Sequence, residues 1–422
     1  MGNLDNRGPI RSRLLALFAV CSLCLSAYAK YGGGSGTAAD PYRIYTAEQM
    51  NTIGANPADW DKQFQLMTDI DLSAYAGTTF NIIGRGSPFE PVTNPFSGVF
   101  DGNGHTISNF KYTSTGVNAV ALFGNVSGAS AKVMNLTLLT PDVQAGVGDY
   151  VGALVGVLEA GTITDCQVER GNVSGRLYVG GLVGSDEGTV MKCCSSGSVG
   201  GDWYVGGLVG GVGDGKVSQC YSTATVSGNK CVGGLVGWTA EETSVVTNSY
   251  ATGTVQAGTY GGGLVGLVER GAAYQCFSTG KVAGNQYVGG LVGNVLALGT
   301  VLQCFWDTQT SGWQTSPGGT GKTTAQMKMI STFTSVGWDF FNIWTICDGR
   351  NYPVLIWQIP RGDFRCPDGV DLIDLAWFAQ HWLNDHCSVG NSFCDGVDLN
   401  ESSFVDFADF AIFADNWLTG IR

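Results

Sequence analysis

The hexapeptide Val-Gly-Gly-Leu-Val-Gly stands complete at residues 179–184, 205–210, 232–237 and 288–293. Near-copies occupy 151–156 and 261–266, and a weaker copy, Val-Ala-Leu-Phe-Gly, occupies 120–124. From Gly152 onward, successive copies are separated by 28, 26, 27, 29 and 27 residues. A repeat this short, rich in glycine and β-branched residues and without helix-length apolar patterns, predicts a β-solenoid with one coil per repeat.

Coils of a solenoid stack in parallel about 4.8 Å apart, and parallel crossovers are right-handed by default. We therefore predict a mainly β fold, a parallel right-handed β-solenoid of about seven coils. Glycine is needed where the backbone takes positive φ or where neighbouring coils approach closely.

Stacking turns single positions into columns. A cysteine column is predicted to be an inward ladder of thiols, because parallel Cβ vectors do not converge for disulfides between coils. A tyrosine column precedes the hexapeptides; it is either a stacked structural face or an exposed surface for polysaccharide. An acidic column is either a solvated edge or a weak divalent-cation site. The columns are Cys166, Cys194, Cys220, Ser249, Cys276 and Cys304; Tyr150, Tyr178, Tyr204, Cys231, Tyr260 and Tyr287; and Glu159, Asp186, Asp214, Glu241 and Glu269.

These repeats resemble those of the GLUG-motif proteins, from about Tyr42 to Trp357. The segments 40–44 and 96–104 resemble the start of such a region, and 338–340 and 351–353 resemble its end. The resemblance implies an exported, surface-associated, β-helix-like protein that is often adhesin-like, and it implies no single activity.

Composition and the N-terminus indicate where the chain acts. The formal net charge of −13 disfavours nucleic acid as a partner, since phosphate binding needs basic clusters. Arg7, Arg11 and Arg13 precede an apolar run over 14–25 and the small residues of 27–29, so residues 1–29 are predicted to be a signal peptide. We expect an extracellular or cell-surface location. The 13 cysteines less Cys21 and Cys24 leave an odd number in an oxidising compartment, so at least one is not paired within the chain.

Catalytic signatures are weak in this sequence. Its three histidines are His105, His381 and His386, which gives little support to a catalytic triad. Residues 318–323 resemble a phosphate-binding loop, but the required first glycine falls on Ser316, so we predict no nucleotide partner. Because many polysaccharide-cleaving enzymes are β-helices, that activity stays open as the alternative to our expectation of a non-enzyme.

The amino-acid composition changes after Pro360, and the last 62 residues contain a duplicated segment whose two copies are 35 residues apart. Segment 371–383 aligns with 406–418, and each copy reads as a loop that leads into an amphipathic helix. The predicted core stripes are Leu375, Phe378, Ala379, Trp382 and Leu383, and Phe410, Phe413, Ala414, Trp417 and Leu418.

Oxygen-bearing side chains precede each helix at calcium-loop spacing. The second loop provides side-chain oxygens at positions 1, 3, 5, 9 and 12 and a backbone carbonyl at 7. The first loop is more degraded, because Arg365 and Pro367 occupy positions 3 and 5; a simple acidic helix cap is the alternative for both. The candidate ligands are Asp398, Asn400, Ser402, Phe404, Asp406 and Asp409 in the second loop, and Asp363, Asp368, Asp371 and Asp374 in the first.

Two calcium loops that each lead a helix resemble a divergent type I dockerin. This resemblance implies a module that folds around calcium and docks to a cohesin-like or cell-surface scaffold partner. The apolar pairs 372–373 and 407–408 replace the polar pairs common after position 9, which puts the partner in doubt. Cys387 and Cys394 are close enough in sequence to pair, and Cys347 and Cys366 could form another disulfide.

The sequence thus predicts five segments: a signal peptide (1–29), an N-terminal cap and lead-in to the solenoid (30–119), the repeats (120–310), a C-terminal cap (311–360) and a dockerin-like domain (361–422). The predicted function is a structural or adhesin-like rod, tethered through a calcium-dependent module. The alternative is an accessory protein of extracellular polysaccharide degradation.

Overall fold

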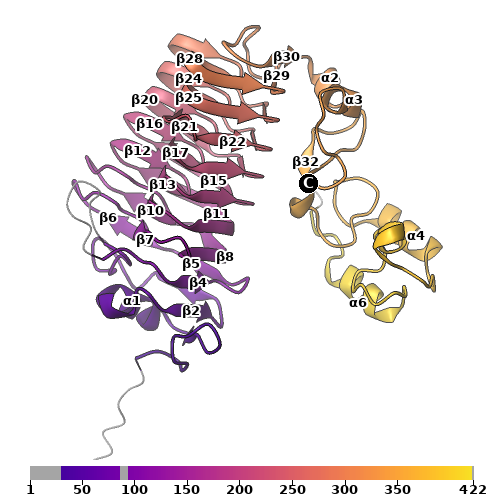
Figure 1. The fold of residues 1–422 in the computed structure, drawn as a ribbon, viewed down its shortest axis with the longest axis horizontal. Coiled ribbons are helices and arrows are strands. Elements are labelled where there is room, and N and C mark those ends of the chain that lie inside the picture. Colours follow the sequence, from indigo (N-terminus) through magenta and orange to yellow (C-terminus); the bar gives the residue numbers. More distant parts are fainter. Residues whose placement is uncertain (1–29, 86–93, 421–422) are drawn as a thin grey trace, which may run out of the picture.

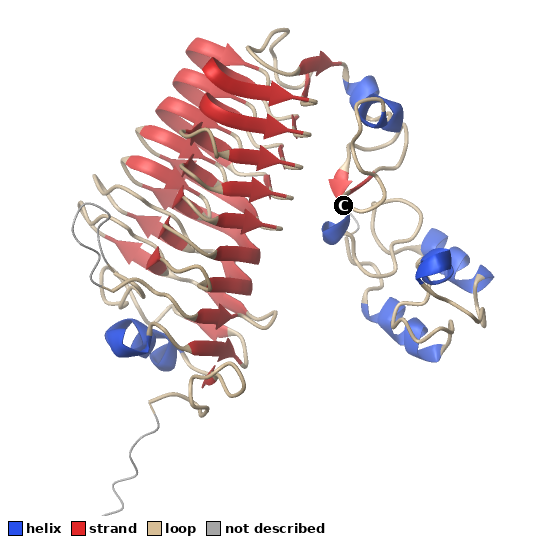
Figure 2. Ribbon diagram, in the orientation of Figure 1, coloured by secondary structure: helices blue, strands red, loops and turns tan. Residues whose placement is uncertain are grey.

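A computed structural model describes residues 30–85 and 94–420, so the predicted signal peptide lies outside the described residues. Among them, strands β1 to β30 form one continuous sheet of 30 strands, and the paired strands of neighbouring coils run parallel. Figures 1 and 2 show this sheet wound into stacked coils, with a small helical region at the C-terminal end. The prediction of a mainly β, parallel solenoid of about seven coils is confirmed.

Each coil places its strands on successive faces of the rod. The strands that begin within each hexapeptide copy are β7 (Phe123–Val126), β10 (Val155–Leu158), β13 (Val183–Asp186), β17 (Val209–Val212), β21 (Val236–Thr239), β25 (Val265–Tyr274) and β28 (Val292–Leu302). The next face holds β4 (Val99–Asp101), β8 (Lys132–Leu139), β11 (Thr162–Ser174), β14 (Thr189–Met191), β18 (Lys216–Ser218) and β22 (Val245–Thr247), continued by β25 and β28.

The chain then turns through β15 (Cys194–Gly200), β19 (Tyr221–Ser222), β23 (Tyr250–Ala251), β26 (Phe277–Ser278) and β29 (Phe305–Asp307). It returns to the hexapeptide through β6 (Lys111–Thr113), β9 (Asp142–Gln144), β12 (Leu177–Gly180), β16 (Trp203–Gly206), β20 (Thr225–Gly233), β24 (Val255–Gly262) and β27 (Val282–Gly289). Strands β1 (Tyr42–Ile44), β2 (Gln63–Leu66), β3 (Ile70–Asp71), β5 (Thr106–Ser108) and β30 (Thr320–Lys322) lie toward the two ends of the sheet.

The hexapeptide glycines lie where backbone meets backbone. A Cβ added to Gly206 would stand 1.9 Å from the carbonyl oxygen of Val209 and 2.8 Å from the amide nitrogen of Gly237 in the next coil. A larger residue would clash with the backbone of its own coil and with that of the next coil, which explains why the motif repeats with the coil.

Valine and leucine side chains fill the interior, and the cysteine column lies among them. The structure corrects one member of that column. Cys193, not Cys194, lies in it, since the Cys193 amide faces the Cys220 sulfur at 3.5 Å. Cys194 faces the other way and is in register with Tyr221. The free cysteines are all buried, as predicted for a thiol ladder, and comprise Cys166, Cys193, Cys194, Cys220, Cys231, Cys276 and Cys304.

Helices and a returning segment cover parts of the rod. At the N-terminal end lie α1 (Ala47–Ala55), capped by the Thr46 side chain, and the 3-10 turn η1 (Pro57–Asp59). At the other end the chain folds back through α2 (Thr324–Met327), α3 (Ile330–Thr334), the antiparallel pair β31 (Trp344–Thr345) and β32 (Val354–Leu355), and η2 (Ile356–Gln358). We call residues 324–358 the strap; Figure 1 shows it running back along the flank of the coils.

The strap covers a second aromatic ladder that the sequence analysis did not identify. Tyr250 stacks between Tyr221 and Phe277, with ring centroids 5.1 and 4.9 Å apart. Three strap tryptophans donate indole hydrogen bonds to the corners of three coils: Trp338 to the carbonyl of Gln303, Trp344 to the side chain of Asn248, and Trp357 to the carbonyl of Gln219. The strap is therefore bonded to coils that lie far from it in sequence.

The C-terminal region contains α4 (Leu372–Gln380), η3 (Val389–Asn391), α5 (Ser392–Asp395) and α6 (Phe407–Asp415). The predicted stripes are only partly core. Phe378 and Phe413 are buried and their rings lie 5.4 Å apart, but Leu383 and Leu418 are 70% and 59% exposed. The difference arises because both helices end before the last stripe positions, at Gln380 and Asp415.

Candidate functional site

The two predicted calcium loops share the same hydrogen bonds around positions 9 and 12, 35 residues apart. In each loop the position-12 carboxylate, Asp374 or Asp409, is buried and accepts backbone hydrogen bonds from position 9 and from the start of the loop. In each loop the position-9 carboxylate, Asp371 or Asp406, caps the helix that follows. The duplication seen in the sequence is therefore a structural duplication.

The second loop wraps its backbone around Asp398. Both oxygens of this buried side chain accept amide hydrogen bonds, from Ser402 at 3.0 Å and Ser403 at 2.9 Å. Asn400 also accepts from the Ser402 amide, and the Ser402 hydroxyl donates to the Phe404 carbonyl at 3.2 Å. Ser403, at the position where glycine is usual, has φ of 77° and so takes the left-handed conformation that the turn requires.

The first loop leaves one oxygen without a partner. Asp363 Oδ2 accepts from the Gly369 amide at 3.0 Å, while Asp363 Oδ1 is buried and has no hydrogen bond. Burial, followed by the charges of Asp374, Asp368 and Asp371, raises the pKa of Asp363 to about 7. Arg365 does not enter the loop, because its guanidinium lies 4.2 Å from the centre of the Trp377 ring.

These features allow the fit to calcium to be judged. Among the described residues, no three histidine, cysteine or acidic side chains are gathered at one point as metal ligands. The oxygens of Asp398 and Asp409 are held instead by backbone amides. The donor set is nonetheless all oxygen, which is the chemistry calcium prefers, and the unpartnered Asp363 oxygen is a buried acceptor that a cation would satisfy.

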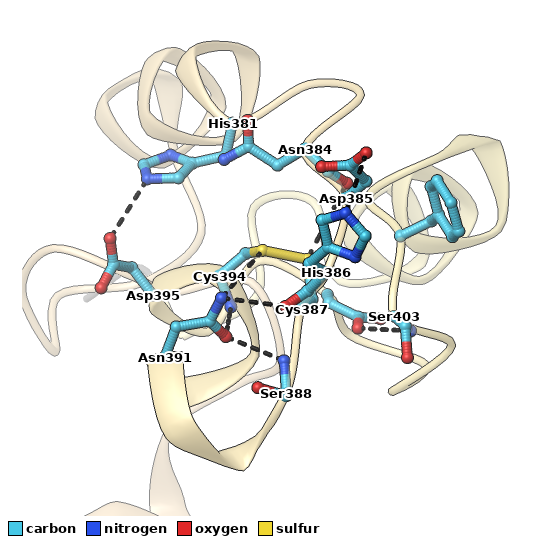
Figure 3. The surroundings of a disulfide bond; sticks show 12 residues. His381, Asn384, Asp385, His386, Cys387, Ser388, Asn391, Cys394, Asp395 and Ser403 are labelled. Carbon is cyan, nitrogen blue, oxygen red and sulfur yellow. Dashed lines mark hydrogen bonds and ion pairs between the residues drawn. A yellow bond between two sulfur atoms is a disulfide. The ribbon is translucent and has the colours of Figure 1, made fainter.

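A disulfide closes the segment between the two helices (Figure 3). Cys387 and Cys394 are bonded, and the Asn391 side chain bridges the backbone around them, accepting from the Ser388 amide at 2.8 Å. The Cys387 amide donates to the Ser403 carbonyl at 3.2 Å, which joins this segment to the second loop. A further disulfide, Cys347–Cys366, joins the strap to the first loop.

The module presents large apolar side chains next to both loops. Leu372 and Ile373 at the start of α4 are 70% and 54% exposed, and Phe407 at the equivalent point of α6 is 77% exposed. Phe404 in the second loop is 54% exposed. Exposed apolar residues of this size at corresponding positions indicate an interaction surface.

The tyrosine column is a stacked structural face along most of its length. Tyr178 lies between Tyr150 and Tyr204 with centroids 4.8 Å apart on both sides, and Trp238 continues the stack at 4.6 Å from Tyr204. Trp238 thereby fills the coil in which Cys231 replaces tyrosine. Both faces of the Tyr178 ring are covered by other rings, so they offer no platform for a sugar. The sequence did not predict that these tyrosines take a left-handed backbone conformation; Tyr178, for example, has φ of 54°.

The acidic column also needs one correction. Asp186 is fully buried, and its Oδ2 atom has no hydrogen bond. Burial raises the pKa of this carboxyl to about 8. The adjacent Glu187 takes its place on the surface, beside Glu159, Asp214 and Glu241, along an open groove of about 570 Å³ next to the tyrosine stack.

Comparison with known proteins agrees with this architecture. The family described as "The GLUG motif" matches residues 201–227 and 228–256. The chain thus carries GLUG-motif repeats on a β-solenoid fold. Neither match falls on the C-terminal helical region.

Relatives and a solved structure share parts of the chain. Halomucin of Haloquadratum walsbyi is 35% identical over 162 residues, which is 36% of this chain and 2% of that protein. A "Putative Gly-rich membrane protein" of Evansella cellulosilytica is 36% identical over 153 residues, 33% of this chain and 16% of that protein. The chain therefore spans only a small part of either relative.

The crystal structure of "a putative immunoglobulin A1 protease" from Bacteroides ovatus superposes with a TM-score of 0.51 at 18% identity. It covers 78% of this chain and 96% of that one, and at this identity the likeness shows the fold alone. None of the described helices combines the length and apolar character needed to cross a membrane.

Proposed function

We propose that this protein is an extracellular or cell-surface rod of structural or adhesin-like function, tethered to a scaffold through its C-terminal calcium-binding, dockerin-like module. The exposed apolar set Leu372, Ile373 and Phe407 is the observation that carries the proposal; it stands where polar pairs are common in dockerins, so the partner it fits must offer an apolar surface. A monomeric domain gains nothing from exposing these side chains, whereas a docking surface gains affinity when a partner removes them from water.

The location proposed for the rod rests on two supports. Disulfides persist in oxidising compartments, and the strap and the module each contribute to one. One relative carries the name of a membrane protein. The predicted signal peptide agrees with export, and the adhesin-like role follows from the GLUG resemblance.

Calcium is proposed as the cofactor that orders the two loops. In the second loop, Asp398, Asn400, Ser402, the Phe404 carbonyl, Asp406 and Asp409 would supply the oxygens. In the first loop Asp363, Asp371 and Asp374 would do so, with Asp368 beside them. A bound cation would offset the repulsion among these carboxylates and fix the helices that carry the apolar surface.

We further propose that the rod is not an enzyme. Glycoside cleavage needs an acid and a base placed across a bound sugar. The groove carboxylates Glu159, Glu187, Asp214 and Glu241 lie in a row of successive coils. Asp186, whose pKa burial raises to about 8, lies in the interior. If the protein takes part in polysaccharide degradation, we therefore expect it to bind the polysaccharide and not to cleave it.

The tethering proposal is tested with a panel of type I cohesin domains, whose binding to the full chain is measured in calcium and in EGTA. We expect calcium-dependent binding to at least one of them, weakened in Leu372→Asp and Phe407→Asp. Val147→Asp, which puts the same charge on a 65% exposed apolar residue of the solenoid, is the matched control and should bind normally. Failure of every cohesin to bind in calcium, or binding that persists in EGTA, would contradict the proposed tether.

A further inference from the structure

The groove beside the tyrosine stack has features that the tether does not use. It is lined by Tyr150, Tyr178 and Trp238 and by the carboxylates of Glu159, Glu187, Asp214 and Glu241, with no lysine or arginine among its described lining residues. Aromatic side chains and uncompensated negative charge therefore meet in one concave surface, four coils long.

Neighbouring residues that do not line the groove offset only part of its negative charge. Glu241 has Arg270 at 3.4 Å, Glu159 accepts from the Asn125 side chain at 2.6 Å, and Asp214 accepts from Thr243 at 2.5 Å. Within the described part of the chain, the carboxylate of Glu187 has no ion-pair or hydrogen-bond partner, and only its backbone amide is bonded, to the Leu158 carbonyl. Partial removal from water, together with the charges of Glu159 and Asp214, raises the pKa of Glu187. An arriving cation would relieve this repulsion.

The rings determine how a ligand can approach. The faces of Tyr178 are covered by its neighbours in the stack, and the Trp238 indole is fixed by its hydrogen bond to Glu269 at 2.9 Å. A ligand therefore meets a rigid aromatic wall and a row of carboxylates. Affinity must come from charge and hydrogen bonding, supported by contact of C–H groups with the rings.

The backbone around the groove argues against a peptide ligand. Strands β10, β13, β17 and β21 are each paired on both sides with neighbouring coils. No strand edge is open there to pair with an extended peptide, which is the usual mode of peptide capture by a sheet. The carboxylates instead recur once per coil, as suits a polymer that carries one cation per unit.

We propose that this groove binds a cationic glycan, a chain of amino sugars with free amines. The ammonium groups would pair with Glu187, Asp214 and Glu159, and the hydroxyls would donate to the remaining carboxylate oxygens. The C–H groups of the sugars would touch only the outer edges of the stacked Tyr150, Tyr178 and Trp238 rings. The same charges repel uronic acids and sulfated glycans. The proposal stands independently of the C-terminal module.

The test measures binding of a glucosamine hexamer to the full chain by calorimetry at low salt, in calcium-free buffer. The N-acetylglucosamine hexamer and hexalysine serve as the neutral glycan and the cationic peptide. We expect the glucosamine hexamer to bind at least tenfold more tightly than either comparison ligand. Exposed ion pairs contribute up to about fivefold each, so Glu187→Gln combined with Asp214→Asn should weaken binding about tenfold.

Two variants separate this groove from other acidic surfaces. Glu48→Gln, at the N-terminal cap, controls for loss of one charge, and Asp398→Asn controls for binding at the module; both should leave glucosamine binding unchanged. Equal binding of the acetylated hexamer, equal binding of hexalysine, or undiminished binding by the double variant would each overturn the proposal. Circular dichroism of the double variant shows whether the solenoid is intact.

Discussion

Gly206→Ala tests the reason for the glycine repeat. The new methyl carbon would stand 1.9 Å from the Val209 carbonyl oxygen, far inside van der Waals contact. That backbone cannot move freely, since the Val209 amide is bonded to the Leu235 carbonyl at 3.1 Å and the Gly207 amide to Gly233 at 3.1 Å in the next coil.

The magnitude follows from two contributions. Overpacking of a close-packed interior costs about 1–3 kcal/mol, and weakening one inter-coil hydrogen bond adds about 1 kcal/mol. We expect a loss of about 3 kcal/mol. At about 2–4 °C per kcal/mol for a domain of this size, the melting temperature should fall by about 6–12 °C.

Thermal unfolding followed by circular dichroism is the assay, with Gly200→Ala as the matched control. A Cβ at Gly200 would meet nothing closer than the Ser227 hydroxyl at 3.5 Å, so this variant should melt within about 2 °C of the natural protein. Equal melting temperatures for the two variants would refute the explanation that the hexapeptide glycines permit close backbone contacts within and between the coils.

Three further predictions concern buried side chains. Folding raises the pKa of Asp186 from 3.8 to about 8, so the free energy of unfolding should fall as pH rises from about 4 to about 8, by up to 1.4 kcal/mol per pH unit. The Asp186→Asn variant should not show this fall. In urea titrations it should be several kcal/mol more stable than the natural protein at pH 8 and no more stable at pH 4. Trp344→Ala removes a fully buried strap residue at a cost of about 3–5 kcal/mol and should expose the strap to limited proteolysis, whereas Phe341→Ala, at a site 79% exposed, should not. The free cysteines should react with Ellman's reagent only after unfolding, because all are buried and burial raises the pKa of Cys194 and Cys231 to about 12; rapid labelling of the native protein would disprove the thiol ladder.

The repeat was readable from the sequence because its cause is local. A coil needs glycine at fixed points of close approach, so the period of the hexapeptide is the period of the fold. The C-terminal duplication was readable for the same reason, since Asp371 and Asp406 cap their helices through the same local hydrogen bonds.

Both errors in the columns fall in one coil and have one cause. Cys194 was predicted where Cys193 lies, and Asp186 where Glu187 lies. Coil lengths vary between 26 and 29 residues, and in a strand a shift of one residue moves a side chain to the opposite face. Column assignment from spacing alone therefore fails where two candidates are adjacent.

The strap and the groove could not be predicted because both depend on contacts between distant residues. Trp357 donates to the carbonyl of Gln219, which lies 138 residues earlier in the chain, and the spacing of the sequence repeats does not predict such a contact. Trp238 completes the tyrosine stack from a different strand than the tyrosines themselves, so its place was visible only in three dimensions.

The most direct test of the proposed tether is a calcium titration of the full chain by calorimetry, compared with Asp398→Asn and Asp363→Asn. We predict heat of binding from the second loop that Asp398→Asn abolishes, and a second, weaker event that Asp363→Asn removes. The absence of any binding at millimolar calcium, or binding unchanged in both variants, would contradict a calcium-dependent module and leave the C-terminal region a disulfide-closed helical hairpin.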